Sequence, residues 1–327
     1  MKIIVTGGAG FIGSAIIWAL NQRGVNDILI VDELGADEKW KNIVPLKYAD
    51  YMEKSIFRQL INNNGLGKFN NSDAVIHMGA CSSTTETNAS FLVDNNFQYT
   101  KELARFADSN SIRFIYASSA ATYGDGTNGY NDDEDAIETL RPLNMYGYSK
   151  QMFDLWAKRT GFLKHCVGLK FTNVFGPNEW HKGDMRSLVC KAYDQIRDAG
   201  VLKLFKSHRD DYADGEQQRD FIYVKDAVDM VLFFLDHSDV NGLFNIGSGE
   251  AETWNALATA IFAGMDLPQK IEYIDMPMHL RDKYQYHTQA EMSKIKAAGY
   301  DKINMSLSDA VKDYVLNYLT HKQHLGE

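Results

Sequence analysis

Short apolar runs alternate with amphipathic segments through the first half of the chain. The runs are typical of buried strands and occupy residues 3–5, 28–31, 73–80 and 113–119, with a shorter one ending at 48–50. The segments between them predict helices that end before residue 24 and that span about 53–63 and 87–109. Strands and helices that alternate in this way indicate a parallel sheet covered on both faces.

We therefore expect an α/β fold built on a doubly wound parallel sheet of the Rossmann type, with a smaller α/β substrate domain. Residues 1–172 and 221–245 would form the dinucleotide-binding domain, and residues 173–220 and 246–327 the substrate domain. The composition shifts after residue 173, and residues 210–216 have the composition of an acidic loop. Since no long linker interrupts the chain, the two parts should share a cleft.

A glycine-rich turn, Thr6-Gly-Gly-Ala-Gly-Phe-Ile-Gly13, joins the first predicted strand to the first helix. Gly7, Gly10 and Gly13 let the backbone turn tightly, and the free N–H groups of the helix N-terminus can then face an anion. Alone, the motif also fits a plain tight turn. However, Asp32 ends the second strand about 20 residues further on, where such folds place an acid for the ribose hydroxyls. The combination predicts a dinucleotide site.

Composition and charge exclude several other classes of protein. The net charge of −9 leaves no basic surplus for a general nucleic-acid binder. No apolar run approaches the roughly 20 residues of a membrane span, and the chain enters a strand at once, so we expect neither a membrane segment nor a signal peptide. Three scattered cysteines favour reduced thiols and a cytoplasmic protein. The nine histidines show no metal-ligand spacing, so no metal is predicted.

A second constellation carries acid/base chemistry. Tyr146 and Lys150 share one face of a predicted helix, and Ser119 ends the preceding predicted strand. A tyrosine and a lysine at this spacing also fit a solvated helix face, but the serine suggests that all three converge beside the dinucleotide. A free tyrosine, with a pKa of about 10, is a poor base at neutral pH. We expect the ammonium of Lys150 and the cationic nicotinamide to lower that pKa, while Ser119 holds the substrate oxygen and Lys150 the nicotinamide ribose.

These motifs resemble the extended short-chain dehydrogenase/reductase superfamily, to which Phe175-Gly-Pro177 adds a further match. Over nearly the whole chain, more specific stretches resemble the ADP-L-glycero-D-manno-heptose 6-epimerase family. These stretches are Gly79-Ala-Cys-Ser-Ser-Thr-Thr-Glu86, Asp94-Asn-Asn96, residues 116–124, His181-Lys-Gly183, Tyr284-Gln285 and Thr288-Gln-Ala290. The resemblance implies a cytoplasmic homo-oligomer, suggested to be a pentamer, that makes an ADP-heptose for the inner core of bacterial lipopolysaccharide.

The resemblance also implies a set of cofactor-binding residues. Beyond the glycines these are Phe11, Ile12, Asp32, Glu33, Lys39, Lys54, Met78, Gly79, Ala80, Cys81, Ser82, Asn95, Lys150, Val174 and Lys182. Asp32 alone would favour NAD, because a carboxylate repels a 2′-phosphate. Lys39 and Lys54 match cationic positions of the family and can offset that repulsion. NADP is therefore the expected cofactor, with NAD as the second choice.

For the ADP-heptose substrate, the resemblance implies contacts at Ser119, Asn173, Asp184, Lys191, Phe205, Lys206, Ser207, His208, Arg219 and Tyr284. Three departures from the family pattern concern these contacts. Asp184 stands where some members carry serine, Asn178 replaces an arginine often found after Gly-Pro, and the acidic loop after His208 has variable length in the family.

Lys182 distinguishes an epimerase from a plain dehydrogenase. Epimerisation oxidises the 6″ alcohol and returns the hydride to the opposite face of the ketone, so a second acid/base is needed on that far side. The resemblance assigns this pair to Tyr146 and Lys182, although Lys182 also fits a surface loop lysine. Two alternatives stay open: another nucleotide-sugar 4-epimerase or dehydratase of the superfamily, or a non-catalytic NADP-binding regulator. A dehydratase needs an acid pair near the serine, where this chain has Ala120-Ala121-Thr122.

Overall fold

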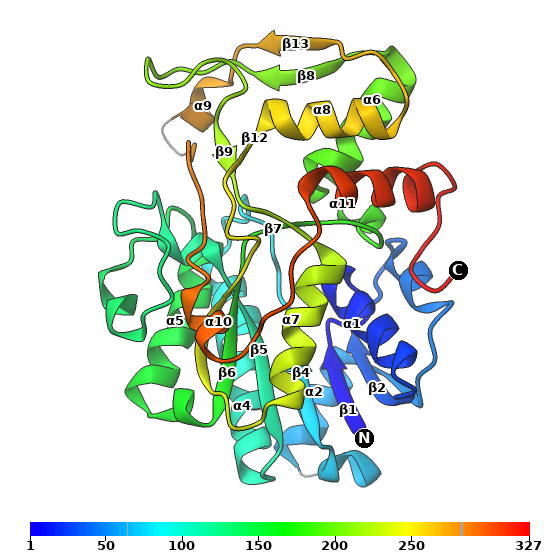
Figure 1. The fold of residues 1–327 in the computed structure, drawn as a ribbon. Helices are drawn as coiled ribbons and strands as arrows, with labels where there is room; N and C mark the ends of the chain where they lie inside the picture. Colours follow the sequence, from blue (N-terminus) through cyan, green and yellow to red (C-terminus); the bar gives the residue numbers. More distant parts are fainter. Residues whose placement is uncertain (64, 282–283) are drawn as a thin grey trace.

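A seven-stranded, entirely parallel sheet forms the centre of the protein in a computed structural model that describes residues 1–63, 65–281 and 284–327 (Figure 1). Its strand order is β11-β6-β5-β4-β1-β2-β3. The strands are β1 (Lys2–Thr6), β2 (Asp27–Asp32), β3 (Asp50–Glu53), β4 (Ala74–His77), β5 (Arg113–Ser119), β6 (Cys166–Phe171) and β11 (Gly242–Ile246). The chain runs outward from β1 to β3 and then returns to β4, so the order reverses beside β1. Ligands of doubly wound sheets bind at such a reversal, at the carboxyl ends of the strands.

Helices cover both faces of this sheet, which confirms the predicted α/β fold. One face is covered by α1 (Phe11–Gln22) and α7 (Val224–Asp236), and the other by α2 (Lys54–Asn62), α4 (Tyr99–Ser109) and α5 (Met145–Arg159). Ile3 and Val5 of β1 belong to the first core, whereas Ile4 belongs to the second. Alternate side chains of one strand thus enter two cores, which explains why the strands are continuous apolar runs.

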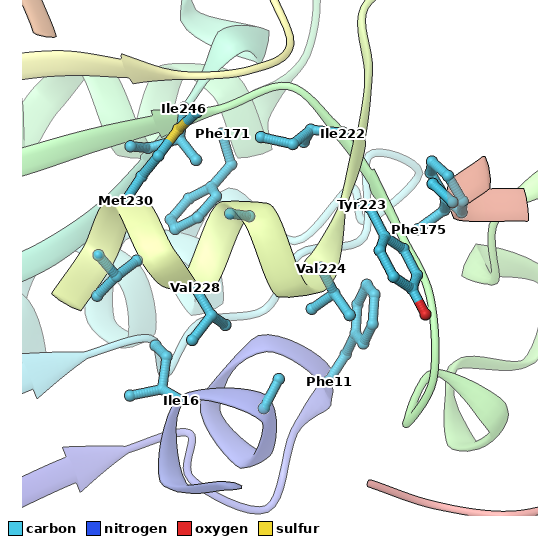
Figure 2. Close-up of a cluster of buried hydrophobic side chains, with 14 of the residues drawn as sticks. Phe11, Ile16, Phe171, Phe175, Ile222, Tyr223, Val224, Val228, Met230 and Ile246 are labelled. Carbon is cyan, nitrogen blue, oxygen red and sulfur yellow. The ribbon is translucent and has the colours of Figure 1, made fainter. Parts of the chain in front are cut away.

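The core on the α1 and α7 side continues to the turn that begins α1. Figure 2 shows Val224 and Val228 of α7 beside Phe11 and Ile16 of α1. Phe11 is only 6% exposed although it stands at the first position of α1. The packing of α7 therefore helps to fix the direction in which the N-terminus of α1 points.

Smaller sheets and helices form a second, C-terminal part of the protein, at the top of Figure 1. Its strand pairs are β8 (Leu202–Phe205) with β13 (Ile271–Ile274) and β9 (Gln218–Arg219) with β12 (Glu252–Thr253). A third pair, β7 (Asn173–Phe175) with β10 (Phe221–Tyr223), lies below them, nearer the large sheet. The helices of the C-terminal part are α6 (Leu188–Ala199), α8 (Trp254–Gly264), α9 (Met278–Arg281) and α11 (Leu307–Tyr314); the short α10 (Ser293–Ala297) lies lower, near β11. Among the helices in the described parts of the chain, none has the length and apolarity to cross a bilayer.

The predicted helix over 87–109 is the main local difference. It consists of α3 (Ala89–Leu92), a π-helical turn (Val93–Gln98) and α4. The wider turn contains Asn95 and Asn96, and Asn96 exchanges hydrogen bonds of 2.9 Å with the backbone N–H and C=O of Cys81. Such turns occur often at functional sites. Here it joins the helix to the loop that follows β4.

Candidate active site

The glycine-rich turn packs directly against the loop after β4. Gly7 has a φ of 66°, and a Cβ there would lie 2.6 Å from the backbone N of Gly79. A Cβ on Gly13 would lie 2.1 Å from the carbonyl oxygen of Gly7. Gly10 is the N-cap of α1 and supplies no side-chain cap, so the first amides of the helix are left to bind something else. This cradle fits a pyrophosphate at the helix N-terminus.

Four charged side chains lie next to this turn. Asp32 accepts hydrogen bonds from the backbone N–H of Ala9 (2.9 Å) and pairs with the Nζ of Lys39 at 3.0 Å. The Nζ of Lys54 lies 2.5 Å from Glu33 and 3.2 Å from the amide oxygen of Asn95. Both lysines therefore lie beside the two acids, and the ion pair with Lys39 offsets the repulsion between Asp32 and a second anion.

A pocket of about 190 Å³ connects these groups. Its lining includes the predicted residues Gly7, Asp32, Glu33, Lys39, Lys54, Gly79, Ala80, Cys81 and Asn95. Phe91 and Tyr99 also line it and were not predicted. The hydroxyl of Tyr99 is buried and has no hydrogen-bond partner among the described residues. Only its place one helical turn after Asn95 could have pointed to it.

A second cavity, of about 1130 Å³, lies between the large sheet and the smaller C-terminal part. It brings together predicted residues from both: Phe11, Ile12, Ser82, Ser119, Tyr146, Asn173, Val174, Lys182, Lys191, Phe205 and Tyr284. Segments far apart in the sequence therefore meet at one surface, large enough for a nucleotide-sized ligand.

Several other predicted residues do not line either cavity. These include Gly10, Gly13, Met78 and Lys150. Asp184 is exposed, and its carbonyl oxygen lies 3.2 Å from the Nζ of Lys191. In the segment after β8, Lys206 pairs with Asp275, the N–H of Ser207 donates to Asp214, and the N–H of His208 donates to Tyr286. These contacts hold the segment's own conformation.

Arg219 is buried and also lies outside the lining. Its guanidinium centre lies 5.0 Å from the ring centroid of Tyr284 and 5.6 Å from that of Trp254. Both rings line the large cavity, and no carboxylate within the described residues forms an ion pair with this arginine. Burial lowers its pKa. The guanidinium also donates to the carbonyl oxygen of Gln218 at 2.8 Å. A buried cation supported by aromatic faces and one carbonyl oxygen favours an anionic ligand nearby.

Ser119, Tyr146 and Lys150 meet where β5 and α5 approach each other. Asn144 caps α5 by accepting from the N–H of Gly147 at 2.8 Å, and a Cβ on Gly147 would lie 2.6 Å from the carbonyl oxygen of Ala121. This close approach brings Tyr146 to the edge of the cavity beside Ser119. Lys150 lies behind them and donates to the carbonyl oxygen of Ala117 at 2.7 Å.

The pKa of Tyr146 differs from the expectation. Burial raises it, and the hydrogen bond with Ser119 opposes that rise. Lys150 does not lower it, because its ammonium is directed at Ala117 and is itself destabilised by burial, which lowers its pKa to about 8. In the protein alone the pKa of this phenol is therefore raised, and the expected lowering, which includes the cationic nicotinamide, stays a prediction for the complex.

Lys182 lies on the short helical segment Trp180–Met185, on the wall of the same cavity as Tyr146. Its Nζ stands 5.3 Å above the ring centroid of Phe11, the first residue of α1. Burial lowers its pKa, and the carboxylate of Glu179 opposes this. An amine in a partly desolvated place can take up and release protons nearer neutrality than a surface lysine.

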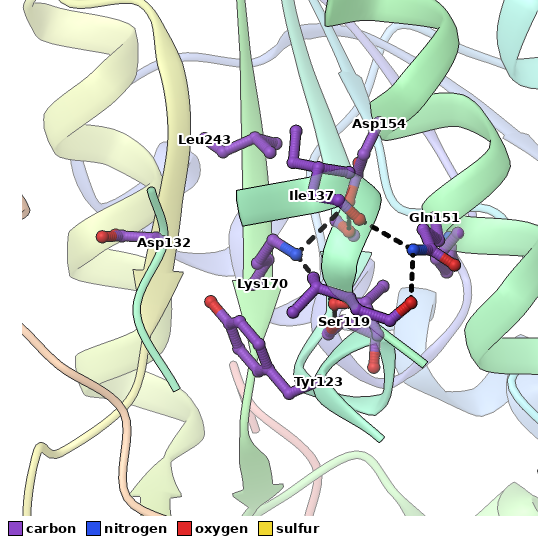
Figure 3. Close-up of polar contacts among 12 residues, drawn as sticks. Ser119, Tyr123, Asp132, Ile137, Gln151, Asp154, Lys170 and Leu243 are labelled. Carbon is purple, nitrogen blue, oxygen red and sulfur yellow. Dashed lines mark hydrogen bonds and ion pairs between the residues drawn. The ribbon is translucent and has the colours of Figure 1, made fainter. Parts of the chain in front are cut away.

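A buried ion pair beneath Ser119 was not predicted. The Nζ of Lys170 lies 3.6 Å from Asp154 and donates to Thr122 at 2.7 Å (Figure 3). Asp154 also accepts from Ser118, and Thr122 donates to the carbonyl oxygen of Ser119. The network therefore fixes the backbone on both sides of the serine. Its one sequence signal is that Asp154 follows Lys150 by one helical turn.

The structure also shows the surroundings of Asn178 and of the three cysteines. Asn178 is fully buried and binds the hydroxyl of Ser14 and the N–H of Leu325, so the family's arginine is replaced by a structural link. Cys166 and Cys190 are buried, whereas Cys81 lines the smaller pocket, and all three are free thiols. Within the described ranges, no cluster of three or more histidine, cysteine or acidic side chains is arranged to hold a metal ion.

Comparison with known proteins agrees with this geometry. The NAD dependent epimerase/dehydratase family matches residues 3–247, which include the glycine-rich turn, Ser119, Tyr146, Lys150 and Lys182. The chain belongs to the NAD dependent epimerase/dehydratase family. A nicotinamide dinucleotide is accordingly the cofactor of this epimerase/dehydratase family member, and the glycine cradle fits it.

Curated relatives of this family member carry a more specific name. The ADP-L-glycero-D-manno-heptose-6-epimerase of Nitratidesulfovibrio vulgaris (strain Hildenborough) is 54% identical over 316 residues, 97% of each chain. That of Fusobacterium nucleatum is 49% identical over 328 residues, 97% of this chain and 98% of the relative. Among solved structures, the enzyme of the same name from Helicobacter pylori has a TM-score of 0.78 at 26% identity, covering 97% of this chain and 95% of that one.

A UDP-N-acetylglucosamine 4-epimerase from Methanobrevibacter ruminantium has a TM-score of 0.81 at 22% identity, covering 98% of this chain and 99% of that one. This likeness supports the fold alone. Membership of the epimerase/dehydratase family rests on the match over residues 3–247, and the curated sequences distinguish members within it.

Replacement of Lys150 by methionine should change how stability depends on pH. The pKa of Lys150 falls from 10.5 to about 8 on folding, so its charged form disfavours the folded state below pH 8, and this cost is lost as pH rises above 8. The cofactor-free parent should therefore gain about 2 kcal/mol from this group between pH 7 and 9.5, and the variant should not. Urea unfolding of both proteins at several pH values measures the difference.

Lys158→Met is the matched control, because Lys158 lies on the same helix but pairs with Asp135 near the surface. Its difference in unfolding free energy from the parent should stay constant with pH. A difference between Lys150→Met and the parent that does not change between pH 7 and 9.5 would contradict the assignment of the shift to Lys150.

Proposed function

We propose that this protein is an ADP-L-glycero-D-manno-heptose 6-epimerase, which interconverts the D-glycero and L-glycero forms of ADP-heptose at C6″. The observation that carries the proposal is the shared cavity, whose wall includes Tyr146 beside β5 and Lys182 on the segment after β7. Two acid/base groups from separate segments suit a reaction that needs proton transfer on both faces of one carbon. The printed names of relatives about half identical to this chain support the substrate.

The cofactor would lie across the carboxyl ends of β1, β2 and β4. The glycine cradle would hold its pyrophosphate, and Asp32, Glu33, Lys39 and Lys54 its adenosine end. We propose NADP, because Lys39 neutralises Asp32 and Lys54 adds a second cation beside the same pocket. When bound, the nicotinamide would accept hydride from C6″ and return it to the other face.

The protein's own groups would handle the oxygen and its proton. Ser119 would hold the C6″ oxygen, and Tyr146 would take its proton as the alcohol becomes a ketone. Lys150, one helical turn behind Tyr146, would supply positive charge once its ammonium turns from Ala117 toward a ligand. After the ketone presents its other face, Lys182 would serve the oxygen from the opposite wall.

The remaining predicted substrate contacts can be ordered by geometry. Asn173, Lys191, Phe205 and Tyr284 line the large cavity, so we propose direct contacts for them. We propose that Arg219 acts on the nucleotide's phosphates from behind Tyr284. Lys206, Ser207 and His208 lie outside the cavity lining and bind Asp275, Asp214 and Tyr286, so we propose that they shape the cavity rather than face it.

The alternatives left open by the sequence receive less support. A dehydratase needs an acid pair next to the serine, but Ala120 and Ala121 line the cavity there. A non-catalytic regulator would have no need of Tyr146 and Lys182 in one cavity. We further propose that residues 1–172 and 221–245 bind the cofactor and the remainder the substrate. A cytoplasmic homo-oligomer, with a pentamer as the form suggested by family resemblance, completes the proposal.

Tyr146→Phe should abolish the principal proton transfer and leave cofactor affinity nearly intact. General acid/base groups contribute roughly 10²–10⁴-fold, so epimer interconversion should fall by that factor. Chromatographic separation of the two ADP-heptoses measures the rate. Tyr148→Phe is the matched control, because Tyr148 lies on the same helix with its side chain exposed, and it should keep the parent rate. Full turnover by Tyr146→Phe would refute the assignment.

Cofactor preference should depend on Lys39 and Lys54. Replacement of both by alanine should weaken NADP at least about tenfold more than NAD, since each charge-assisted contact to the 2′-phosphate is worth roughly 1.5–3 kcal/mol. Titration of protein fluorescence with each cofactor measures both affinities. The control is Lys41→Ala, whose side chain pairs with Glu38 at the surface. Equal weakening of both cofactors would show that the two lysines act elsewhere.

Lys182→Met should keep its fold and bind cofactor but lose epimer interconversion by a factor on the order of 10². Tyr146 would still serve one face, so deuterium at C6″ should still reach the cofactor, and reduced cofactor should accumulate. Both quantities are measured on the same preparation, with the surface variant Lys158→Met as control. Interconversion at the parent rate in Lys182→Met would show that the enzyme needs only one acid/base group.

A further inference from the structure

Two consecutive polar residues, Asn178 and Glu179, are fully buried at the base of the segment that carries Lys182. Asn178 has a φ of 79°, a left-handed conformation that asparagine tolerates better than most residues. Burial of two adjacent polar side chains is costly unless both are fully hydrogen-bonded. Their partners therefore indicate what the two residues hold in place.

Glu179 connects the two ends of the Lys182 segment. Its carbonyl oxygen accepts from the N–H of Lys182 at 3.0 Å. Its carboxylate accepts from both the hydroxyl (2.7 Å) and the backbone N–H of Ser187, the residue that caps α6. It also accepts from Tyr314 at 3.1 Å and from the N–H of Gly176 at 3.4 Å. The segment 180–186 is thus a loop closed at its base by one carboxylate.

Asn178 fixes the same base to the cofactor side of the protein. Its amide nitrogen donates to the hydroxyl of Ser14 on α1 at 2.9 Å. The backbone carbonyl oxygen of Asn178 accepts from the side-chain amide of Asn42 at 3.0 Å. The same amide nitrogen of Asn42 also donates to the backbone carbonyl oxygen of Ala9 in the glycine-rich turn. The loop and the turn therefore share one set of buried bonds, and Lys182 stands above Phe11 where they meet.

The charge of Glu179 acts on Lys182 as well. Its carboxylate has no ion-pair partner within 4 Å in the parts of the chain that the structure describes. Lys182 is the cation that opposes the rise in its pKa, and Glu179 in turn opposes the fall in the pKa of Lys182. The loop base and the amine at its tip are therefore coupled both by bonds and by charge.

We propose that Glu179 and Asn178 are positioning residues that hold Lys182 over the first residue of α1, and so on the far side of the reacting carbon from Tyr146. This inference rests on the proposed function, in which Lys182 is the second acid/base group. Loss of either residue's bonds should impair proton transfer at Lys182 while leaving Tyr146 in place, because neither residue forms a hydrogen bond or ion pair with Tyr146 in the described parts of the chain.

The test is the Glu179→Gln variant, which keeps the size of the side chain but replaces one acceptor oxygen by a donor. Epimer interconversion should fall about tenfold or more, whereas deuterium transfer from C6″ to the cofactor should stay within about threefold of the parent. Cofactor affinity and melting temperature are measured on the same preparation. Asp132→Asn is the matched control, because Asp132 is a buried carboxylate that accepts from Asn245 outside this loop.

A second variant keeps the test decisive if Glu179→Gln does not fold. Asn178→Gly retains the left-handed backbone and removes the bonds to Ser14 and Leu325, and it should show the same selective loss of interconversion. Interconversion and deuterium transfer that fall together, or interconversion at the parent rate, would overturn the positioning role.

Lys182→Met, run in parallel, separates this failure from failure of the proposed function. If Lys182→Met loses interconversion and Glu179→Gln does not, only the positioning role is wrong. If Lys182→Met interconverts epimers at the parent rate, the two-group mechanism and the positioning role are overturned together.

Discussion

The placement of charged lysines in partly dry surroundings is the constraint on which this active site depends. An ammonium removed from water is costly unless it is paired or hydrogen-bonded. The lysines of this site differ in their partners. Lys39 pairs with Asp32 and Lys170 with Asp154, whereas Lys150 donates to a carbonyl oxygen and Lys182 lies over an aromatic face. The pairing decides which of them stays a fixed structural charge and which is available to a ligand.

This difference explains how far the sequence could predict the site. The glycine-rich turn, Asp32 and the pair Tyr146 and Lys150 depend on local spacing, so their elements could be placed from the chain alone. The buried pair of Asp154 and Lys170 joins α5 to β6, and such a contact leaves no mark in local periodicity. The direction of the Tyr146 pKa was also beyond reach, because burial and the actual partner of Lys150 decide it.

The fold could be predicted where local sequence pattern determines the structure, and not where contacts between distant residues determine it. Strands buried on both faces are continuous apolar runs, which explains why the doubly wound sheet could be predicted. The π-helical turn at 93–98 could not be predicted, because it accompanies hydrogen bonds of Asn96 to the backbone of Cys81, a contact 15 residues away that local periodicity does not reveal. Likewise, the sequence could not show what Asn178 does in place of the family's arginine, because its partners, Ser14 and Leu325, are far away along the chain.

Epimerisation also gives a physical reason for the division of the cavity between segments. A single rigid element can present an acid/base group to one face of a planar ketone only. Tyr146 is fixed to the large sheet through α5 and its cap at Asn144, whereas Lys182 is carried by a loop closed by Glu179. The Lys182 loop contacts the first turn of α1, and α5 packs against β5 of the same sheet, so both groups are fixed to the sheet that carries the cofactor cradle. In the proposed mechanism, the two groups would then serve opposite faces without a large movement of either segment.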